Sequence, residues 1–133
     1  EVFPLVELWY EQAIQFETIS EINHYLIVQI CNYLKIDTKI SFSSDYNLLE
    51  YGKTERLVDL CKQTNATEYF SGPAAKEYMD VAMFEKEGVK VNFYDYSNYQ
   101  KYTQLYDEFE HGVSILDLMF NEGTNSSKFL KYI

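Results

Sequence analysis

The chain has 133 residues, of which 47% are hydrophobic, and this is enough for a core of its own, so we expect one α/β domain over residues 1–133. A formal net charge of −10 argues against a nucleic-acid partner, because a phosphate-binding face needs clustered Lys and Arg. No run of about 18 apolar residues occurs, so we expect no membrane insertion.

The N-terminal part of the chain is predicted to be helical. Pro4 suits the first turn of a helix that covers residues 3–16. Ser20 is the predicted N-cap of a second helix, in which apolar residues recur at helical spacing from Ile22 to Leu34.

Three short segments read as strands, at residues 38–43, 68–71 and 89–94, because apolar and polar residues alternate in the first and third and aromatic residues dominate the second. A helix capped by Thr54 and another beginning at Pro73 separate them. Connections that contain a helix usually make neighbouring strands parallel. We therefore expect a small three-layer unit with a short parallel sheet, a βαβαβ core, flanked by N-terminal and C-terminal helices.

The cysteines and histidines are isolated in the sequence. Cys31 and Cys61 lie in apolar helical patterns outside any CxxC pair, so we expect buried free thiols, as in a reducing cytoplasm. His24 and His111 have no ligand-like spacing, so we expect no metal site and no cofactor. His24 is interpreted as a packing residue and His111 as a surface or capping residue, although a histidine could also act as a general base.

The last predicted helix carries polar residues within an apolar stretch, "VSILDLMFNEG". Ser114, Asp117 and Asn121 recur at spacings of three and four, so they share one edge of that helix. A carboxylate among apolar neighbours needs a partner. The partner is either a structural network that ties the helix to a nearby loop or a ligand, and the sequence leaves both open.

Three segments would meet at the carboxyl ends of the parallel strands, where ligands bind in open sheets: "FSSDYNLLEYGKTER", "YFSGPAAKEY" and "FYDYSNYQKYTQ". In "SGPAAK", Ser71 and Gly72 end a strand, and the following helix N-terminus suits an anion. In "GKTER", Lys53 and Arg56 oppose the dipole of the helix that they begin, which indicates a role other than helix stability. The alternatives are a capped turn without a ligand and a solvated charged turn.

Three stretches in this order resemble the C-terminal part of the WbqC-like family: "GKTERLVDLCKQTNATEYFSGPAAKEYMD", "FEKEGVKVNFYDYSNYQKYTQ" and "HGVSILDLMFNEG". The resemblance implies a cytoplasmic protein of bacterial surface-polysaccharide gene clusters, such as those for O-antigen. Members are described as transferases, and a glycine transferase role has been suggested for them.

The family's motif positions fall on ten residues of this chain. Among these motif positions we expect Ser114, Asp117 and Asn121 to be the catalytic residues. We expect substrate-binding positions at Lys53, Thr54, Arg56, Ser71, Gly72, Tyr102 and Gln104.

The chain departs from the family pattern in three places. It lacks the segment with a His-Gln-Pro-like stretch that usually precedes this region, so we expect a fragment of the family sequence. Thr103 stands where the family often has proline. Glu122 stands where the family often has cysteine, which excludes a cysteine nucleophile at that position.

The sequence leaves three hypotheses. The first is an enzyme that transfers an acyl or aminoacyl group, such as glycyl, to a small-molecule nucleotide-linked sugar. The second is a non-catalytic sugar-binding or scaffold module, in which some of the 13 tyrosines line a sugar groove. The third is a fragment whose exposed apolar surface drives association into a homo-oligomer.

Overall fold

The computed structural model describes residues 1–48, 50, 52–106 and 108–131, and it divides into two compact units. The first unit joins Glu1–Ile40 with Asn98–Ile133, and the second is Ser41–Ser97. Each unit has a hydrophobic core cluster of its own.

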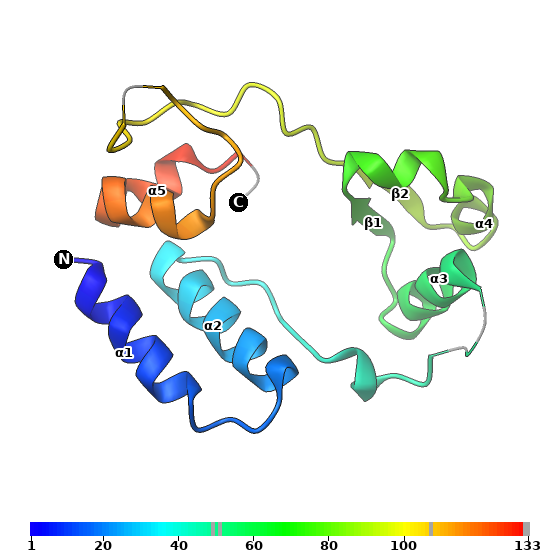
Figure 1. Cartoon of the computed structure of the whole chain (residues 1–133). Coiled ribbons are helices and arrows are strands. Elements are labelled where there is room, and N and C mark those ends of the chain that lie inside the picture. Colours follow the sequence, from blue (N-terminus) through cyan, green and yellow to red (C-terminus); the bar gives the residue numbers. More distant parts are fainter. Residues whose placement is uncertain (49, 51, 107, 132–133) are drawn as a thin grey trace. The chain divides into compact units, whose positions relative to one another are not determined.

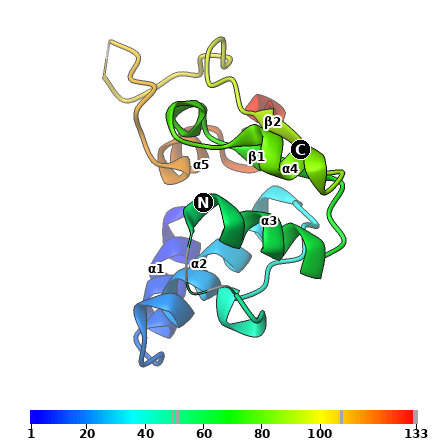
Figure 2. The ribbon, with the colours of Figure 1, turned by 90° about the vertical axis from the view of Figure 1, so that its right-hand side faces the viewer.

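The first unit is built from helices (Figure 1). These are α1 (Phe3–Ala13), α2 (Ile19–Leu34), α5 (Ile115–Glu122) and a 3-10 helix, η3 (Gly123–Phe129). Helices α1 and α2 lie side by side in both ribbon views (Figures 1 and 2), and α2 and α5 each contact η3. Their shared core contains Val2, Val6, Trp9, Leu34 and Met119.

Helix α2 begins two residues earlier than the sequence predicted. Its N-cap is Thr18, not Ser20, and the Thr18 hydroxyl accepts a hydrogen bond from the Glu21 N–H at 3.2 Å. The Glu21 carboxylate accepts one from the Thr18 N–H at 3.0 Å in return, which completes a capping box. The reciprocal pair satisfies two backbone donors, so Thr18 is a better start than Ser20.

The second unit contains the sheet. Its elements are η1 (Ser43–Asp45), α3 (Lys53–Gln63), β1 (Glu68–Ser71), η2 (Pro73–Glu77), α4 (Val81–Lys86) and β2 (Lys90–Phe93). Strands β1 and β2 are parallel, with Glu68 opposite Lys90 and Ser71 opposite Phe93. The prediction of a parallel sheet with a helix in the connection is confirmed.

The predicted strand at residues 38–43 does not form, so the described sheet has two strands and the βαβαβ core is absent from it. Local bonds to Asp45 take both backbone groups of Phe42, which a ladder would otherwise use. The Phe42 N–H donates to Asp45 Oδ2 at 3.0 Å, and the Asp45 N–H donates to the Phe42 carbonyl at 3.1 Å. The alternation at residues 38–43 therefore ends in a turn instead of a strand.

The sheet is packed on one face only within the described part of this unit. Tyr69, Val91 and Phe93 lie against the core of Val58, Cys61, Ala75, Met79, Phe84 and Val89. On the opposite face Glu68, Phe70 and Lys90 are exposed. The described residues thus form two layers here, where three were predicted.

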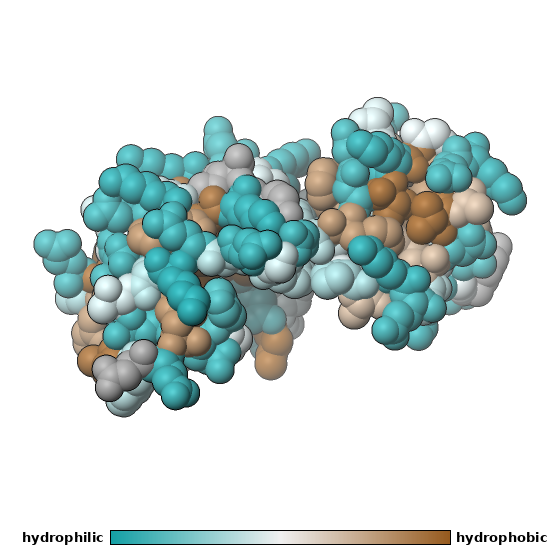
Figure 3. Space-filling model, turned by 90° about the horizontal axis from the view of Figure 1, so that it is seen from above, coloured by the Kyte–Doolittle hydropathy of each residue, from teal (hydrophilic) through white to brown (hydrophobic). Residues whose placement is uncertain are grey.

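Hydrophobic side chains are interspersed with hydrophilic ones on the face shown in Figure 3. Exposed apolar residues on α1 include Phe3 and Leu8. No helix in the described part of the chain is long and apolar enough to cross a membrane.

Candidate functional site

Asp117 lies in the first turn of α5, and the sequence fixes its position through the start of that helix. The Ser114 hydroxyl accepts a hydrogen bond from the Leu116 N–H at 3.3 Å, so Ser114 is the N-cap. The first turn then places Leu118 and Met119 in the core and leaves Asp117 half-buried. A carboxylate also suits a helix N-terminus, where the macrodipole is positive.

Two side chains from the preceding loop donate to the same oxygen of Asp117. The Tyr102 hydroxyl donates to Asp117 Oδ2 at 2.7 Å, and Gln104 Nε2 donates to it at 2.9 Å. No hydrogen bond from the described residues reaches Asp117 Oδ1. The carboxylate is therefore oriented through one oxygen and keeps the other available as an acceptor.

Gln104 also joins two parts of its own loop. Its Nε2 donates to the Glu110 carbonyl at 2.9 Å, and its Oε1 accepts from the Glu110 N–H at 2.8 Å. A side-chain amide offers a donor and an acceptor in the geometry of a peptide group, so it can pair with a backbone as a strand would. Gln104 thus ties residue 110 and the Tyr102 segment to helix α5 at one point.

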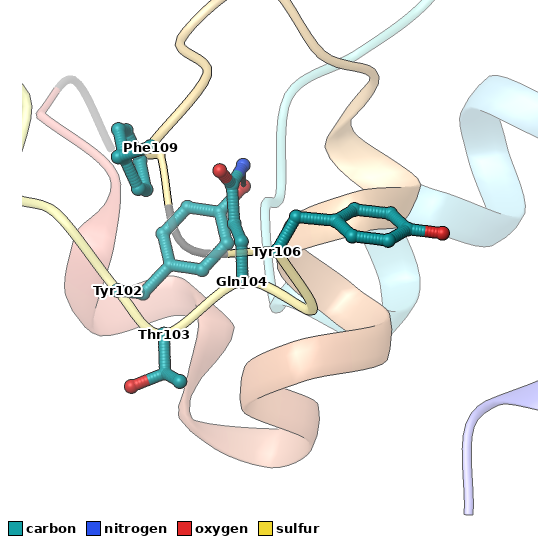
Figure 4. Close-up of a pocket in the computed structure, with 5 residues that line it drawn as sticks. All are labelled: Tyr102, Thr103, Gln104, Tyr106 and Phe109. Carbon is teal, nitrogen blue, oxygen red and sulfur yellow. Dashed lines mark hydrogen bonds between the residues drawn. The ribbon is translucent and has the colours of Figure 1, made fainter.

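A cavity of about 220 Å³ adjoins this network, lined by Tyr102, Thr103, Gln104, Tyr106 and Phe109 (Figure 4). Tyr102 and Gln104 point to the same side of their segment, while Thr103 points to the opposite side. The Tyr102 ring meets Phe109 edge-on, with centroids 5.1 Å apart. Aromatic walls with a few polar groups are typical of ligand pockets.

The pKa of the Tyr102 hydroxyl is raised above its ordinary value, first by burial and then by the hydrogen bond that it donates to Asp117. Both causes favour the protonated phenol. Tyr102 therefore keeps its proton at neutral pH and acts as a donor toward Asp117.

The other two predicted residues of α5 do not join the carboxylate. Ser114 serves as the helix cap, and Asn121 Nδ2 donates to the backbone carbonyl of Asp117 at 2.8 Å. Both side chains are exposed. The shared helix edge predicted from spacing exists, but only Asp117 uses it to contact the loop.

Five predicted residues lie in the second unit. Lys53 and Arg56 are exposed in the first turn of α3, and Thr54 lies between them, half-buried. Gly52, not Thr54, is the N-cap of that helix. No ion pair among the described residues involves Lys53 or Arg56, so both cations remain available to a ligand.

The element that follows Ser71 and Gly72 differs in type and length from the predicted helix. This element is a five-residue 3-10 helix, Pro73–Glu77. So short a helix lacks the macrodipole that the predicted binding of an anion at its N-terminus would need. Gly72 has φ −69° and ψ 156°, a conformation that any residue adopts. The chain turns here, since the Ala75 N–H donates to the Gly72 carbonyl at 3.1 Å, but this turn does not require glycine.

The sequence identified Tyr102 in the cavity wall, but not Tyr106, Phe109 or the backbone partner of Gln104. The rings of Phe109 and His111 meet edge-on, with their centroids 4.6 Å apart, and His111 itself is exposed. The richness of this segment in tyrosine was a signal for a ring-lined surface, but no pattern indicates Glu110, because its backbone makes the contact. Among the described residues no group of three His, Cys, Asp or Glu side chains could hold a metal ion.

The chain is similar to proteins of one family. It is 46% identical over 118 residues to an uncharacterized protein of Mycobacterium tuberculosis, Rv1507c, covering 89% of this chain and 51% of the relative. The chain therefore spans about half the length of the curated relative that it matches. No solved structure matches the sequence significantly. The model of the WbqC-like protein family matches residues 1–129, so the chain belongs to the WbqC-like protein family.

Proposed function

We propose that the chain contributes to an acyl or aminoacyl transferase, with glycyl as one candidate group, that acts on a nucleotide-linked sugar in bacterial surface-polysaccharide synthesis. The observation that supports this is the orientation of Asp117 by Tyr102 and Gln104 beside an aromatic cavity. All three are positions of the family motifs, and the loop that carries Tyr102 and Gln104 precedes Asp117 by 13 to 15 residues.

The proposed step uses Asp117 as a general base. Asp117 Oδ1 takes a proton from an amino or hydroxyl group of the sugar. The nitrogen or oxygen of that group then uses its lone pair to form a bond to the carbonyl carbon of the acyl donor. The bond from that carbon to the donor's leaving group breaks, and the leaving group departs with the electron pair. Tyr102 and Gln104 hold the carboxylate in one rotamer during this step.

In this proposal Lys53 and Arg56 of the second unit are residues that bind a nucleotide phosphate, with Thr54 beside them as a hydroxyl donor. This role is supported by two observations on Lys53 and Arg56. Both are exposed and have no ion-pair partner among the described residues, in a chain with only 11 basic residues. Ser71 and Gly72 would contact the ligand through their backbone groups, without the help of a helix dipole. Ser114 and Asn121 stabilise the two ends of the helical segment that carries Asp117.

A sugar-binding module without chemistry is the second candidate. Asp117 is already bonded to the loop, as in a structural network, and Tyr102, Tyr106 and Phe109 give the cavity aromatic surfaces on which a sugar face can stack. In this case the carboxylate holds the loop that presents the rings.

Thermal unfolding with nucleotide diphosphates and their amino-sugar derivatives tests the first proposal. We expect the nucleotides to raise the melting temperature of the wild type, and we expect the rise to disappear in the double variant Lys53→Ala/Arg56→Ala. Lys86→Ala, which removes a charge at the last residue of α4, is the matched control. No rise with any of these compounds would contradict the proposal.

Mass spectrometry of the sugar nucleotide separates catalysis from binding. After incubation with acyl or glycyl donors, the wild type should add the acyl mass to the sugar, and Asp117→Asn should bind the nucleotide without adding it. Binding without any mass gain in the full-length M. tuberculosis relative would favour the sugar-binding module.

A further inference from the structure

We propose that the outer edge of strand β1 is a docking site for an extended polypeptide strand, supplied by the part of the longer family polypeptide that lies outside the matched region. Docking at this edge would serve the assembly of the fold and not the reaction. The two-stranded sheet leaves the outer edge of β1 without a neighbouring strand among the described residues.

The hydrogen bonds of the sheet show which backbone groups point to this edge. The Lys90 N–H donates to the Thr67 carbonyl, and the Tyr94 N–H donates to the Ser71 carbonyl, both at 2.9 Å. A strand directs the backbone groups of alternate residues to opposite sides, so residues 67, 69 and 71 face β2. The backbone of Phe70 therefore points away from β2, and no hydrogen bond among the described residues uses it.

A hollow of about 320 Å³ runs along this edge. Three consecutive residues of β1, Glu68, Tyr69 and Phe70, line it, and no residue of β2 does. Consecutive residues of one strand share a hollow only at its edge, since their side chains point to opposite faces. Ser41 and Tyr46 also line the hollow, and their hydroxyl oxygens are 2.7 Å apart.

An extended peptide is the occupant that fits this chemistry. Its backbone can satisfy the outward N–H and C=O groups of β1, which is how peptides add to sheet edges. A two-stranded sheet is marginal by itself, and an uncovered edge invites pairing with another chain. Phe70, with 50% of its surface exposed, offers an apolar contact beside the edge.

The length of the relative indicates where this strand comes from. The match to this chain covers 51% of the M. tuberculosis protein, so about half of that polypeptide lies outside the match. A segment of the same polypeptide reaches the edge at a high effective concentration, unlike a separate partner. We therefore assign the edge to an intramolecular strand of the longer family members.

Amide hydrogen exchange tests this assignment in two proteins, the 133-residue chain and the full-length relative. In this chain we expect the Phe70 amide to exchange at least about tenfold faster than those of Tyr69 and Ser71, which face β2. In the full-length relative the amide aligned with Phe70 should be as slow as its neighbours. Fast exchange at that amide in the relative would overturn the proposal.

Two other occupants give distinct results, and each would also overturn it. Slow exchange of the Phe70 amide in dilute samples of this chain would show that the chain covers its own edge. Protection that increases with protein concentration would assign the edge to a second copy.

Proline substitution gives an independent test, because proline removes the N–H. Phe70→Thr is the control, since it removes the same ring and keeps the N–H. We expect Phe70→Pro and Phe70→Thr to melt within a few degrees of each other in this chain, and the aligned proline variant to melt well below the threonine variant in the relative. If the melting temperatures of the proline and threonine variants differed by the same amount in both proteins, the result would contradict an added strand.

Discussion

The Tyr102 hydroxyl and the Asp117 carboxylate are 15 residues apart in the chain and 2.7 Å apart in the structure. This contact joins the tyrosine-rich loop to helix α5. Both residues lie in the first unit, together with Gln104, which completes the network at the same carboxylate oxygen.

Replacing Tyr102 by Phe removes one of the two donors to Asp117 Oδ2. The ring contacts with Phe109 and Phe129 remain, so we expect a loss of about 1 kcal/mol in the free energy of unfolding, typical of a hydrogen bond to a partly buried group. Urea unfolding at pH 7 measures it. A loss near zero would show that the bond is not maintained in solution.

The same variant has a distinct response to alkaline pH. Burial and the bond to Asp117 raise the pKa of Tyr102 above its ordinary value of about 10. Its contribution to stability is therefore fully present below pH 10 and is lost as pH rises through the folded pKa. The wild type should therefore lose more stability than Tyr102→Phe between pH 9 and the upper limit of the titration. The measurement is the difference between the melting temperatures of the two proteins over this pH range. Because both proteins contain the other tyrosines, their shared effect cancels in this difference.

Gln104→Ala should loosen the loop without unfolding the unit, because it removes both bonds to the Glu110 backbone and one to Asp117. We expect faster hydrogen exchange at the Glu110 amide. Thr103→Ala is the neighbouring control, since the Thr103 side chain points to the opposite side (Figure 4). Equal exchange in the two variants would contradict the role of Gln104.

The start of helix α2 can be tested at two hydroxyl residues on either side of Ile19. Thr18→Ala should lower the free energy of unfolding by about 1 kcal/mol, because it removes the cap and its capping box, whereas Ser20→Ala should change it little. The Glu21 pKa is lowered by its bonds to Thr18, so the Glu21 contribution is present above pH 4.5 and is lost as pH falls through the folded pKa. Urea unfolding at pH 7 and pH 3 should show a smaller difference between Thr18→Ala and wild type at the lower pH.

Two glycines should respond to alanine with opposite signs. Gly72→Ala should stabilise the protein by about 0.5 kcal/mol, because its φ is −69° and an added Cβ meets only the Tyr96 hydroxyl at 3.5 Å. Gly88→Ala should destabilise it by about 1–2 kcal/mol, since φ is +75° there even though the space is open. Thermal unfolding of both variants measures the contrast, and a loss at Gly72 would indicate a constraint other than backbone conformation.

The local elements of this protein were largely readable from the sequence. Strand β1 was predicted with its observed bounds, Glu68–Ser71, and the parallel relation to residues 90–93 followed from the helix in their connection. Both cysteines are free, as predicted, although Cys31 is half-buried. These features depend on neighbours within a few residues, or on a single rule of chain connection, so a linear pattern contains the necessary information.

Other features were decided by tertiary structure. The alternation at residues 38–43 predicted a strand, but a strand forms only when its backbone pairs with that of another strand. Here the side chain of Asp45 accepts the hydrogen bond of the Phe42 N–H instead. Spacing grouped Asp117 with Ser114 and Asn121, yet the partners of its carboxylate are Tyr102 and Gln104, which only chain folding brings near. The sequence by itself determined that Asp117 needs a partner, because a carboxylate among apolar residues is costly to desolvate, and the tertiary structure decided which residues supply it.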